Sequence, residues 1–155
     1  MQLQVGSPAP AFTLPGPGGR EIALSGFAGR KVVLYFYPKD DTSGCTQEAR
    51  EFSALKADFE AAGTEVIGIS PDSPKSHEKF VGKHGLELTL LSDETKEMLQ
   101  AYGVWVEKSM YGRKYMGVER TTLLIDGDGK IARIWSKVKV PGHAKEVLEA
   151  ARALG

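Results

Sequence analysis

The sequence predicts an α/β domain of three layers, with a mixed central sheet and an N-terminal hairpin. Short runs rich in valine, isoleucine and leucine alternate with segments whose apolar residues recur every three or four positions. This alternation is typical of parallel strands joined by helices, and a second hairpin near the C-terminus adds antiparallel strands. No internal repeat or linker interrupts the 155 residues, so we expect residues 1–155 to form a single domain.

The first third of the chain predicts a hairpin followed by a buried strand. Phe12–Leu14 and the alternating segment Glu21–Leu24 flank a turn made of Pro15–Gly19, which is typical of two paired strands. A short loop then leads to the apolar run Lys31–Tyr37. A short apolar run without alternation is typical of a strand that is buried on both faces.

Two helices and two strands are expected in the middle of the chain. A helix starts at Cys45, carries one apolar stripe and ends at Gly63. The stripe consists of Ala49, Phe52, Leu55 and Phe59. A strand over 65–69 follows, then a helix over 74–84 and a short strand over 88–91.

The last third predicts a helix, an irregular segment, a hairpin and a terminal helix. The helix covers 94–102, and residues 104–119, rich in Gly, Tyr and Lys, predict an irregular segment. Strands over 121–125 and 131–135 form the hairpin. The terminal helix follows Pro141–His143 and has one apolar face, made of Val147, Leu148, Ala151 and Leu154.

Composition excludes several classes of protein. The formal net charge is zero, and no basic stripe or Cys/His finger spacing indicates nucleic-acid binding. The longest apolar runs are too short to span a membrane. One cysteine cannot form an intramolecular disulfide, so we expect a reducing, cytoplasmic location. No cofactor is expected, and the spacing of His77, His84 and His143 favours surface histidines over a metal site.

Cys45, the only cysteine, stands where a strand and a turn rich in Pro and Asp give way to a helix. Unpaired N–H groups and the helix dipole at such a position favour a thiolate over a thiol. The thiolate is the reactive form of cysteine. The alternative is a small, buried and inert thiol, which is the commoner fate of a lone cysteine.

The residues around Cys45 resemble the active-site pattern of the peroxiredoxins, Pro-x-x-x-Thr-x-x-Cys, which stands here as Pro38, Thr42 and Cys45. The segment Tyr37–Ala49 is similar to the bacterioferritin comigratory protein branch, also called Q-type. Further matches are spread along nearly the whole chain: Gly6–Leu14, Gly68–Asp72, Leu91–Asp93, Tyr102–Trp105 and Glu119–Asp126. The resemblance implies a thioredoxin-like fold and antioxidant, thiol-dependent reduction of hydroperoxides.

In that reaction the Cys45 thiolate attacks one peroxide oxygen and becomes a sulfenic acid, while the other oxygen leaves as water or alcohol. When the pKa of a cysteine falls from about 8.5 to about 6, its thiolate fraction at pH 7 rises roughly thirtyfold, but its nucleophilicity falls roughly ten- to twentyfold. Most of the acceleration must therefore come from donors that hold the peroxide and stabilise the leaving oxygen.

Thr42 and Arg120 are the donors that we expect. Thr42 lies one helical step before Cys45, so its hydroxyl can reach the same space; the alternative is a plain N-cap. Arg120 precedes an apolar run, where a guanidinium needs an anionic partner such as a thiolate. The alternative for Arg120 is a strand-end arginine paired with a surface carboxylate. The family resemblance favours the catalytic interpretation of both residues.

Two further residues complete the expected site. Glu48 lies three residues after Cys45 on the same side of the helix, and the resemblance implies that it orients the arginine. The alternative for Glu48 is a solvated helix carboxylate. Pro38 has no side-chain donor, so its expected role is to shape the turn and screen the sulfur from water. The backbone N–H of Cys45 is expected to complete the peroxide cradle.

The chain departs from a common family pattern at Arg50, where many members carry a second, resolving cysteine. We therefore expect a one-cysteine mechanism, in which an external thiol such as thioredoxin, glutaredoxin or glutathione resolves the sulfenic acid. The resemblance also implies a monomer or weak homodimer. Rival functions are a redox sensor that relays Cys45 oxidation to a partner protein, a thiol–disulfide oxidoreductase and a binding module. The absence of a Cys-x-x-Cys pair argues against the oxidoreductase.

Overall fold

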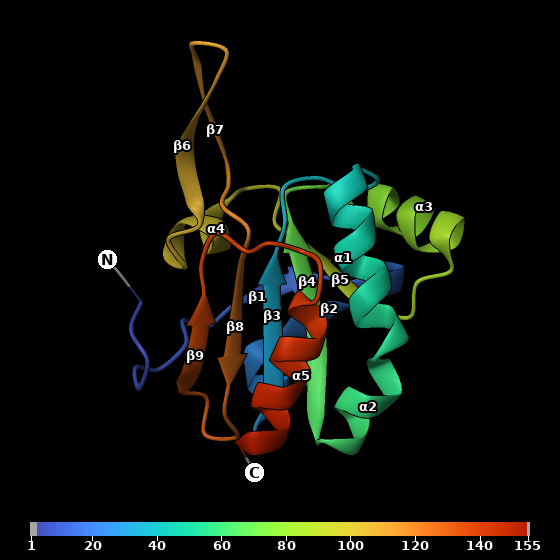
Figure 1. Ribbon diagram of the computed structural model, residues 1–155, viewed down its shortest axis with the longest axis vertical. Helices are drawn as coiled ribbons and strands as arrows, with labels where there is room; N and C mark the ends of the chain where they lie inside the picture. Colours follow the sequence, from blue (N-terminus) through green and yellow to red (C-terminus); the bar gives the residue numbers. More distant parts are fainter. Residues whose placement is uncertain (1–2, 155) are drawn as a thin grey trace.

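A five-stranded mixed sheet forms the centre of the molecule, in the order β5-β4-β3-β8-β9 (Figure 1). The computed structural model describes residues 3–154, so residues 1–2 and 155 of the expected domain lie outside the described part. β3 runs parallel to β4, and β4 parallel to β5, whereas β8 is antiparallel to both β3 and β9. The strands are β3 Lys31–Phe36, β4 Thr64–Ser70, β5 Thr89–Ser92, β8 Thr121–Ile125 and β9 Ile131–Trp135.

Both faces of the sheet are buried, which explains the continuous apolar run of β3. Val33 and Tyr35 point into a core shared with Phe52 of the helix layer. Val32 and Leu34 point into a second core on the opposite face. Because side chains alternate along a strand, one unbroken apolar run supplies both cores. The prediction of a three-layer α/β fold with a mixed sheet is confirmed.

Five helices surround the sheet in the described part of the chain, and α3 and the start of α5 match the sequence prediction. The predicted helix from Cys45 to Gly63 is instead two helices, because the backbone at Leu55 turns to φ −101° and ψ 8°. None of the helices within residues 3–154 is long and apolar enough to cross a membrane. The helices are α1 Ser43–Ala54, α2 Lys56–Ala61, α3 Pro74–His84, α4 Glu97–Ala101 and α5 His143–Ala153.

The N-terminal hairpin is confirmed and lies against the sheet face opposite α1. It pairs β1 (Thr13–Pro15) with β2 (Glu21–Ala23) in antiparallel register. Two 3₁₀ turns flank β2: η1 covers Pro17–Gly19 and η2 covers Leu24–Phe27. Side chains of this region, including Ile22, pack on the core that contains Leu34.

The prediction that residues 104–119 are irregular is wrong, because they form a regular hairpin of β6 (Trp105–Met110) and β7 (Arg113–Val118). Polar and charged residues occupy both faces of these strands, so the sequence shows no apolar alternation. The two-residue turn of Tyr111 and Gly112 has positive φ at both positions, as a tight hairpin requires. The hairpin projects beyond the sheet, at the end where α1 begins (Figure 1).

Candidate active site

Cys45 lies in the first turn of α1, directly above the C-terminal end of β3. The helix begins at Ser43, and a backbone hydrogen bond joins the N–H of Thr46 to the carbonyl oxygen of Thr42 at 2.8 Å. The N–H of Cys45 therefore precedes the intrahelical bonds and remains available to a ligand. The Cys45 side chain is almost completely buried among the aromatic residues beneath α1.

Arg120 reaches Cys45 because β8 pairs with β3 in a fixed register. Thr121, the first residue of β8, lies opposite Phe36, the last residue of β3, so Arg120 stands beside the loop that follows β3. The Nη2 of Arg120 donates a hydrogen bond to the Sγ of Cys45 at 3.2 Å. Its Nη1 donates to the Oε1 of Glu48 at 2.5 Å. One guanidinium thus contacts both the thiol and the carboxylate of α1.

Charge and burial act in opposite directions at this cluster. Burial disfavours the charged form of Arg120, but the negative charges of Glu48 and Cys45 outweigh it and raise the pKa of the guanidinium. For Glu48, burial dominates and raises the pKa from 4.5 to about 7, although Arg120 acts to lower it. Glu48 is 1% exposed, so the alternative of a solvated helix carboxylate is wrong.

Thr42 and Pro38 lie in the same loop but do not contact the thiol by a hydrogen bond within the described residues. Thr42 occupies the N-cap position of α1, yet its side chain makes no capping bond, so the plain N-cap alternative is wrong. Its hydroxyl instead donates to the carbonyl oxygen of Lys39 at 2.9 Å. Pro38 is half-buried at the end of β3. The structure therefore joins Cys45, Glu48 and Arg120 directly and leaves Thr42 and Pro38 beside them.

Lys108 is a further charged residue near the site that the sequence did not identify. It stands on β6, and its side chain crosses β7 beside Gly117, where an added Cβ would lie 3.3 Å from the Lys108 Cδ. Partial burial lowers the pKa of Lys108, and the positive charge of Arg120 lowers it further, while Glu119 and Cys45 raise it. Lys108 was missed because its segment was expected to be irregular.

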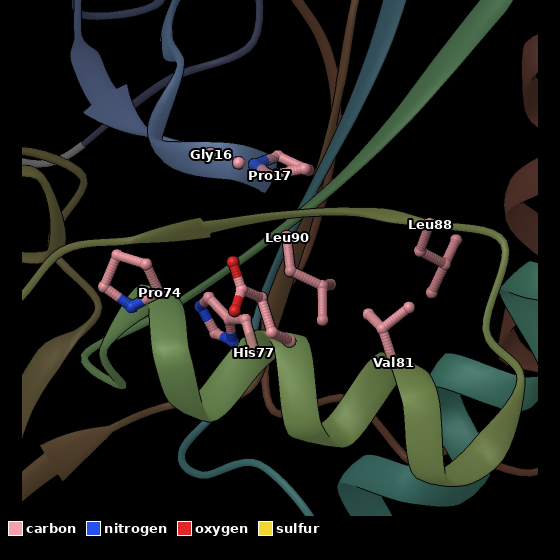
Figure 2. Close-up of a pocket in the computed structure, with 9 residues that line it drawn as sticks. Gly16, Pro17, Pro74, His77, Val81, Leu88 and Leu90 are labelled. Carbon is pink, nitrogen blue, oxygen red and sulfur yellow. The ribbon is translucent and has the colours of Figure 1, made fainter.

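A separate cavity of about 120 Å³ lies between α3 and the N-terminal hairpin (Figure 2). Its lining is mostly apolar, with Val81, Leu88 and Leu90 pointing into it. The imidazole of His77 borders this cavity, but Cys45 does not line it. The chemistry of the site therefore lies outside this cavity.

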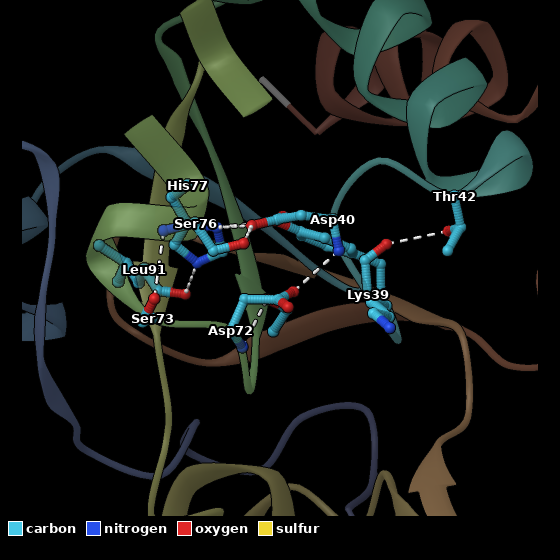
Figure 3. A network of polar contacts seen from close by, with 10 residues as sticks. Lys39, Asp40, Thr42, Asp72, Ser73, Ser76, His77 and Leu91 are labelled. Atoms are coloured by element: carbon cyan, nitrogen blue, oxygen red, sulfur yellow. Dashed lines mark hydrogen bonds and ion pairs between the residues drawn. The ribbon is translucent and has the colours of Figure 1, made fainter. Parts of the chain in front are cut away.

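A network of polar side chains ties the loop before Cys45 to α3 (Figure 3). The carboxylate of Asp40 accepts hydrogen bonds from the hydroxyls of Tyr37, at 2.6 Å, and Ser76, at 2.8 Å. It also lies 2.7 Å from the Nδ1 of His77, whose Nε2 lies 3.0 Å from the carbonyl oxygen of Leu91. Tyr37 and Asp40 come from the segment that follows β3, Ser76 and His77 from α3, and Leu91 from β5.

The expectation that the histidines lie at the surface is wrong for His77 and His143, which are both buried. Each has hydrogen-bond partners inside the protein, so burial leaves no ring nitrogen of His77 unpaired. His77, Phe80 and His84 recur at steps of three and four on α3, and this spacing is the signal that could have indicated a buried face.

The same network contains three groups of the metal-binding type, but their atoms are already in use. Ligand atoms of Asp40, Asp72 and His77 lie within 4.8 Å of one another. Both oxygens of Asp40 and both ring nitrogens of His77 take part in hydrogen bonds within the protein. We therefore interpret the cluster as a hydrogen-bonded tie between two segments.

Comparison with known proteins identifies the class. Residues 5–134 match the AhpC/TSA family. "Putative peroxiredoxin bcp" of Coxiella burnetii is 50% identical over 148 residues, covering 96% of this chain and 98% of the relative. Peroxiredoxin Bcp of Bacillus subtilis is 43% identical over 149 residues, covering 96% and 95%.

Solved structures agree with these relatives. The bacterioferritin comigratory protein of Xanthomonas campestris, studied for alkyl peroxide reduction, has a TM-score of 0.88 at 43% identity and covers 92% of this chain and 91% of its own. A PrxQ mutant of Xylella fastidiosa has a TM-score of 0.94 at 38% identity, covering 99% and 98%. The predicted thioredoxin-like fold is confirmed, and the molecule is a peroxiredoxin, an enzyme that reduces hydroperoxides with a thiol reductant.

The chain belongs to the AhpC/TSA family, and its relatives at 43–50% identity are Bcp or peroxiredoxin Q proteins. The resemblance inferred from the sequence is therefore confirmed, including the lack of a second cysteine.

Proposed function

We propose that the enzyme reduces hydrogen peroxide and organic hydroperoxides through Cys45, by a one-cysteine mechanism. The Cys45 thiolate attacks one peroxide oxygen, the O–O bond breaks, and the bonding electrons leave with the other oxygen, which takes up a proton. Water or an alcohol departs, and Cys45 is left as a sulfenic acid. The observation that carries the proposal is the hydrogen bond from Arg120 to the sulfur at 3.2 Å, because a cation at that distance stabilises the thiolate.

The neighbouring groups have complementary roles in this proposal. Arg120 and the free N–H of Cys45 donate to the peroxide and to the charge that develops on the leaving oxygen. Glu48 holds the guanidinium in place through Nη1, which leaves Nη2 aimed at the sulfur. Thr42 accepts a hydrogen bond from the peroxide O–H, since its own hydrogen is donated to Lys39. Pro38 shapes the loop and shields the sulfur.

An external thiol completes the cycle. A first thiolate attacks the sulfenic sulfur, releases water and forms a mixed disulfide, and a second thiol then regenerates Cys45. Arg50 occupies the position of the missing resolving cysteine and hydrogen-bonds to the Nδ1 of His84 at 3.0 Å. Because the chain holds no other cysteine, thioredoxin, glutaredoxin or glutathione is the proposed reductant. The cytoplasmic location, the monomeric or weakly dimeric state and the single domain stay predictions.

The proposal is tested by peroxide consumption with an added thiol system and by mass spectrometry with a sulfenic-acid trap. We expect Cys45→Ser to abolish turnover and Arg120→Ala to reduce kcat/KM by on the order of a hundredfold, with Arg133→Ala, on the far strand of the sheet, as the control. Undiminished turnover in the serine variant would end the proposal. Oxidation that stalls after one equivalent, with a specific mixed disulfide to a partner protein, would indicate the redox sensor instead.

A further inference from the structure

The hydroxyl of Thr42 has only one hydrogen, and the structure commits that hydrogen to Lys39. Its donor–acceptor distance to the Lys39 carbonyl oxygen is 2.9 Å. A hydroxyl that donates in one direction offers only its lone pairs elsewhere. The direction of the Lys39 carbonyl therefore decides whether Thr42 presents a lone pair or a hydrogen to a bound hydroperoxide.

That carbonyl belongs to the same planar peptide unit as the N–H of Asp40. In a trans peptide the C=O and the N–H point in opposite directions, so fixing one fixes the other. The N–H of Asp40 donates to the Oδ2 of Asp72 at 2.8 Å. Figure 3 shows this arrangement, with Asp72 on one side of the peptide and Thr42 on the other.

Asp72 is itself held at the end of β4. Its Oδ2 accepts a hydrogen bond from the hydroxyl of Ser70 at 2.7 Å, and its own N–H donates to the same hydroxyl at 3.1 Å. Ser70 is completely buried, so this carboxylate has a rigid support. The strand that carries the support is part of the central sheet.

The loop needs such support because its backbone is not in a favoured conformation. Asp41, the residue after the peptide, has φ 59°, a left-handed value that is disfavoured for a residue with a Cβ. Side-chain contacts must therefore hold the loop in place. The Asp40 side chain anchors one end of it through Tyr37, Ser76 and His77, but those bonds do not set the rotation of the peptide plane.

We propose that Asp72 is a positioning residue for peroxide reduction, which acts through the Lys39–Asp40 peptide to aim the lone pairs of Thr42 at the substrate. This inference rests on the proposed function of Cys45 and Thr42. Asp72 does not touch the substrate; its carboxylate orients the peptide, the peptide orients the hydroxyl, and the hydroxyl accepts from the O–H of the hydroperoxide. Removing the carboxylate frees the peptide to rotate and the hydroxyl to turn.

A double-mutant cycle separates this role from a general structural one. The variants are Thr42→Val, Asp72→Ala and the double mutant, with hydrogen peroxide as substrate. Loss of one hydrogen bond in the transition state corresponds to a decrease in kcat/KM of on the order of tenfold for each single variant. If Asp72 acts through Thr42, the double mutant loses no more than Thr42→Val alone, because the hydroxyl that Asp72 aims is already absent.

Three controls accompany the cycle. Asp72→Asn keeps an oxygen that accepts from the Asp40 N–H, so we expect its kcat/KM to stay within about threefold of the parent value. Asp128→Ala removes an exposed carboxylate from the β8–β9 turn and is expected to change nothing. Alkylation of Cys45 by iodoacetamide, which does not use Thr42, should proceed at the parent rate in Asp72→Ala.

The inference is overturned if the double mutant loses the product of the two single effects, or if Asp72→Ala reduces peroxide as fast as the parent enzyme. Neither result affects the proposed function, which fails if Cys45→Ser retains activity or if oxidation of the parent enzyme stalls after one equivalent of peroxide. Should Asp72→Ala not fold, as judged by circular dichroism, the same cycle is run with Ser70→Ala. That variant keeps the carboxylate but removes the hydroxyl that orients it, and the same lack of additivity with Thr42→Val is expected.

Discussion

At the scale of single residues, Glu48 is a group whose charge near neutral pH depends on the fold. Its side chain is buried, its Oε1 is bound by Arg120, and its Oε2 has no hydrogen-bond partner within the described residues. A carboxylate in this position is only partly compensated, because one guanidinium is shared between Glu48 and Cys45. Burial therefore raises the pKa of Glu48 to about 7, and its ionisation is linked to stability.

We predict that Glu48→Gln flattens the dependence of stability on pH. Because the pKa of Glu48 is higher in the folded than in the unfolded state, the folded state binds more protons between pH 4.5 and about 7. The contribution of Glu48 to the free energy of unfolding is fully present below pH 4.5 and is lost as the pH rises to about 7. The loss is on the order of 3 kcal/mol. Urea unfolding across this range measures the slope. A variant slope equal to that of the parent would contradict the prediction, and Glu60→Gln on exposed α2 is the control.

The residues of the site differ in how far sequence alone could place them. Cys45 and Glu48 share one side of α1 by helical spacing, and the family pattern supplied Arg120, which no local spacing connects to α1. The direction of the Thr42 hydroxyl could not be predicted, because it depends on one peptide plane and on Asp72, thirty residues away in the chain. Contacts of this kind leave no periodic trace in a sequence.

At the scale of elements, segments with regular apolar patterns were predicted correctly, whereas the polar β6–β7 segment was not. The strands over 121–125 and 131–135 have the predicted bounds, because apolar residues mark them in the sequence. The helix over 74–84 also has the predicted bounds, because Ser73 caps its start and Gly85 ends it. The β6–β7 hairpin was missed, since cross-strand pairing rather than burial holds it together. The break at Leu55 was missed because an apolar stripe continues across it.

The hydrogen bonds between α3 and the loop before α1 lead to a prediction for His77. Gln places its amide nitrogen near the position of Nε2, whereas Asn places its amide nitrogen near Nδ1. His77→Gln therefore keeps the hydrogen bond to the carbonyl oxygen of Leu91 and loses the one to Asp40. His77→Asn keeps the hydrogen bond to Asp40 and loses the one to Leu91. We expect His77→Gln to be the less stable variant, by about 1–2 kcal/mol, because a carboxylate loses more than a neutral carbonyl when its donor is removed.

Two measurements check this prediction. Urea unfolding compares the stabilities, and iodoacetamide reports the access to Cys45, which is 2% exposed in the intact protein. Only His77→Gln should speed alkylation, since of the two His77 hydrogen bonds only the one to Asp40 reaches the loop before α1. Glu78→Gln, an exposed neighbour on α3, is the matched control. Equal alkylation rates in the two histidine variants would show that the tie does not restrain the loop.

At the scale of the whole molecule, the central sheet separates the site from half of the hydrophobic core. Cys45 belongs to the core that contains Tyr35 and Phe52, on the face of the sheet covered by α1. Leu99 of α4 belongs to the core on the other face. The rings of Tyr35 and Phe52 stack with centroids 4.7 Å apart, so a change at Phe52 disturbs the core that also contains the thiol, whereas a change at Leu99 must cross the sheet.

We therefore predict that stability and activity respond differently to truncation on the two faces. Phe52→Ala and Leu99→Ala both remove completely buried side chains and should cost about 3–5 and 2–5 kcal/mol. Only Phe52→Ala leaves a cavity in the core that contains Cys45, so only that variant should also lower kcat/KM for hydrogen peroxide, by on the order of tenfold, under conditions where both remain folded. Urea unfolding and peroxide turnover at 25 °C measure the two effects. A parallel loss of activity in Leu99→Ala would mean that the site depends on overall stability rather than on the packing of one face.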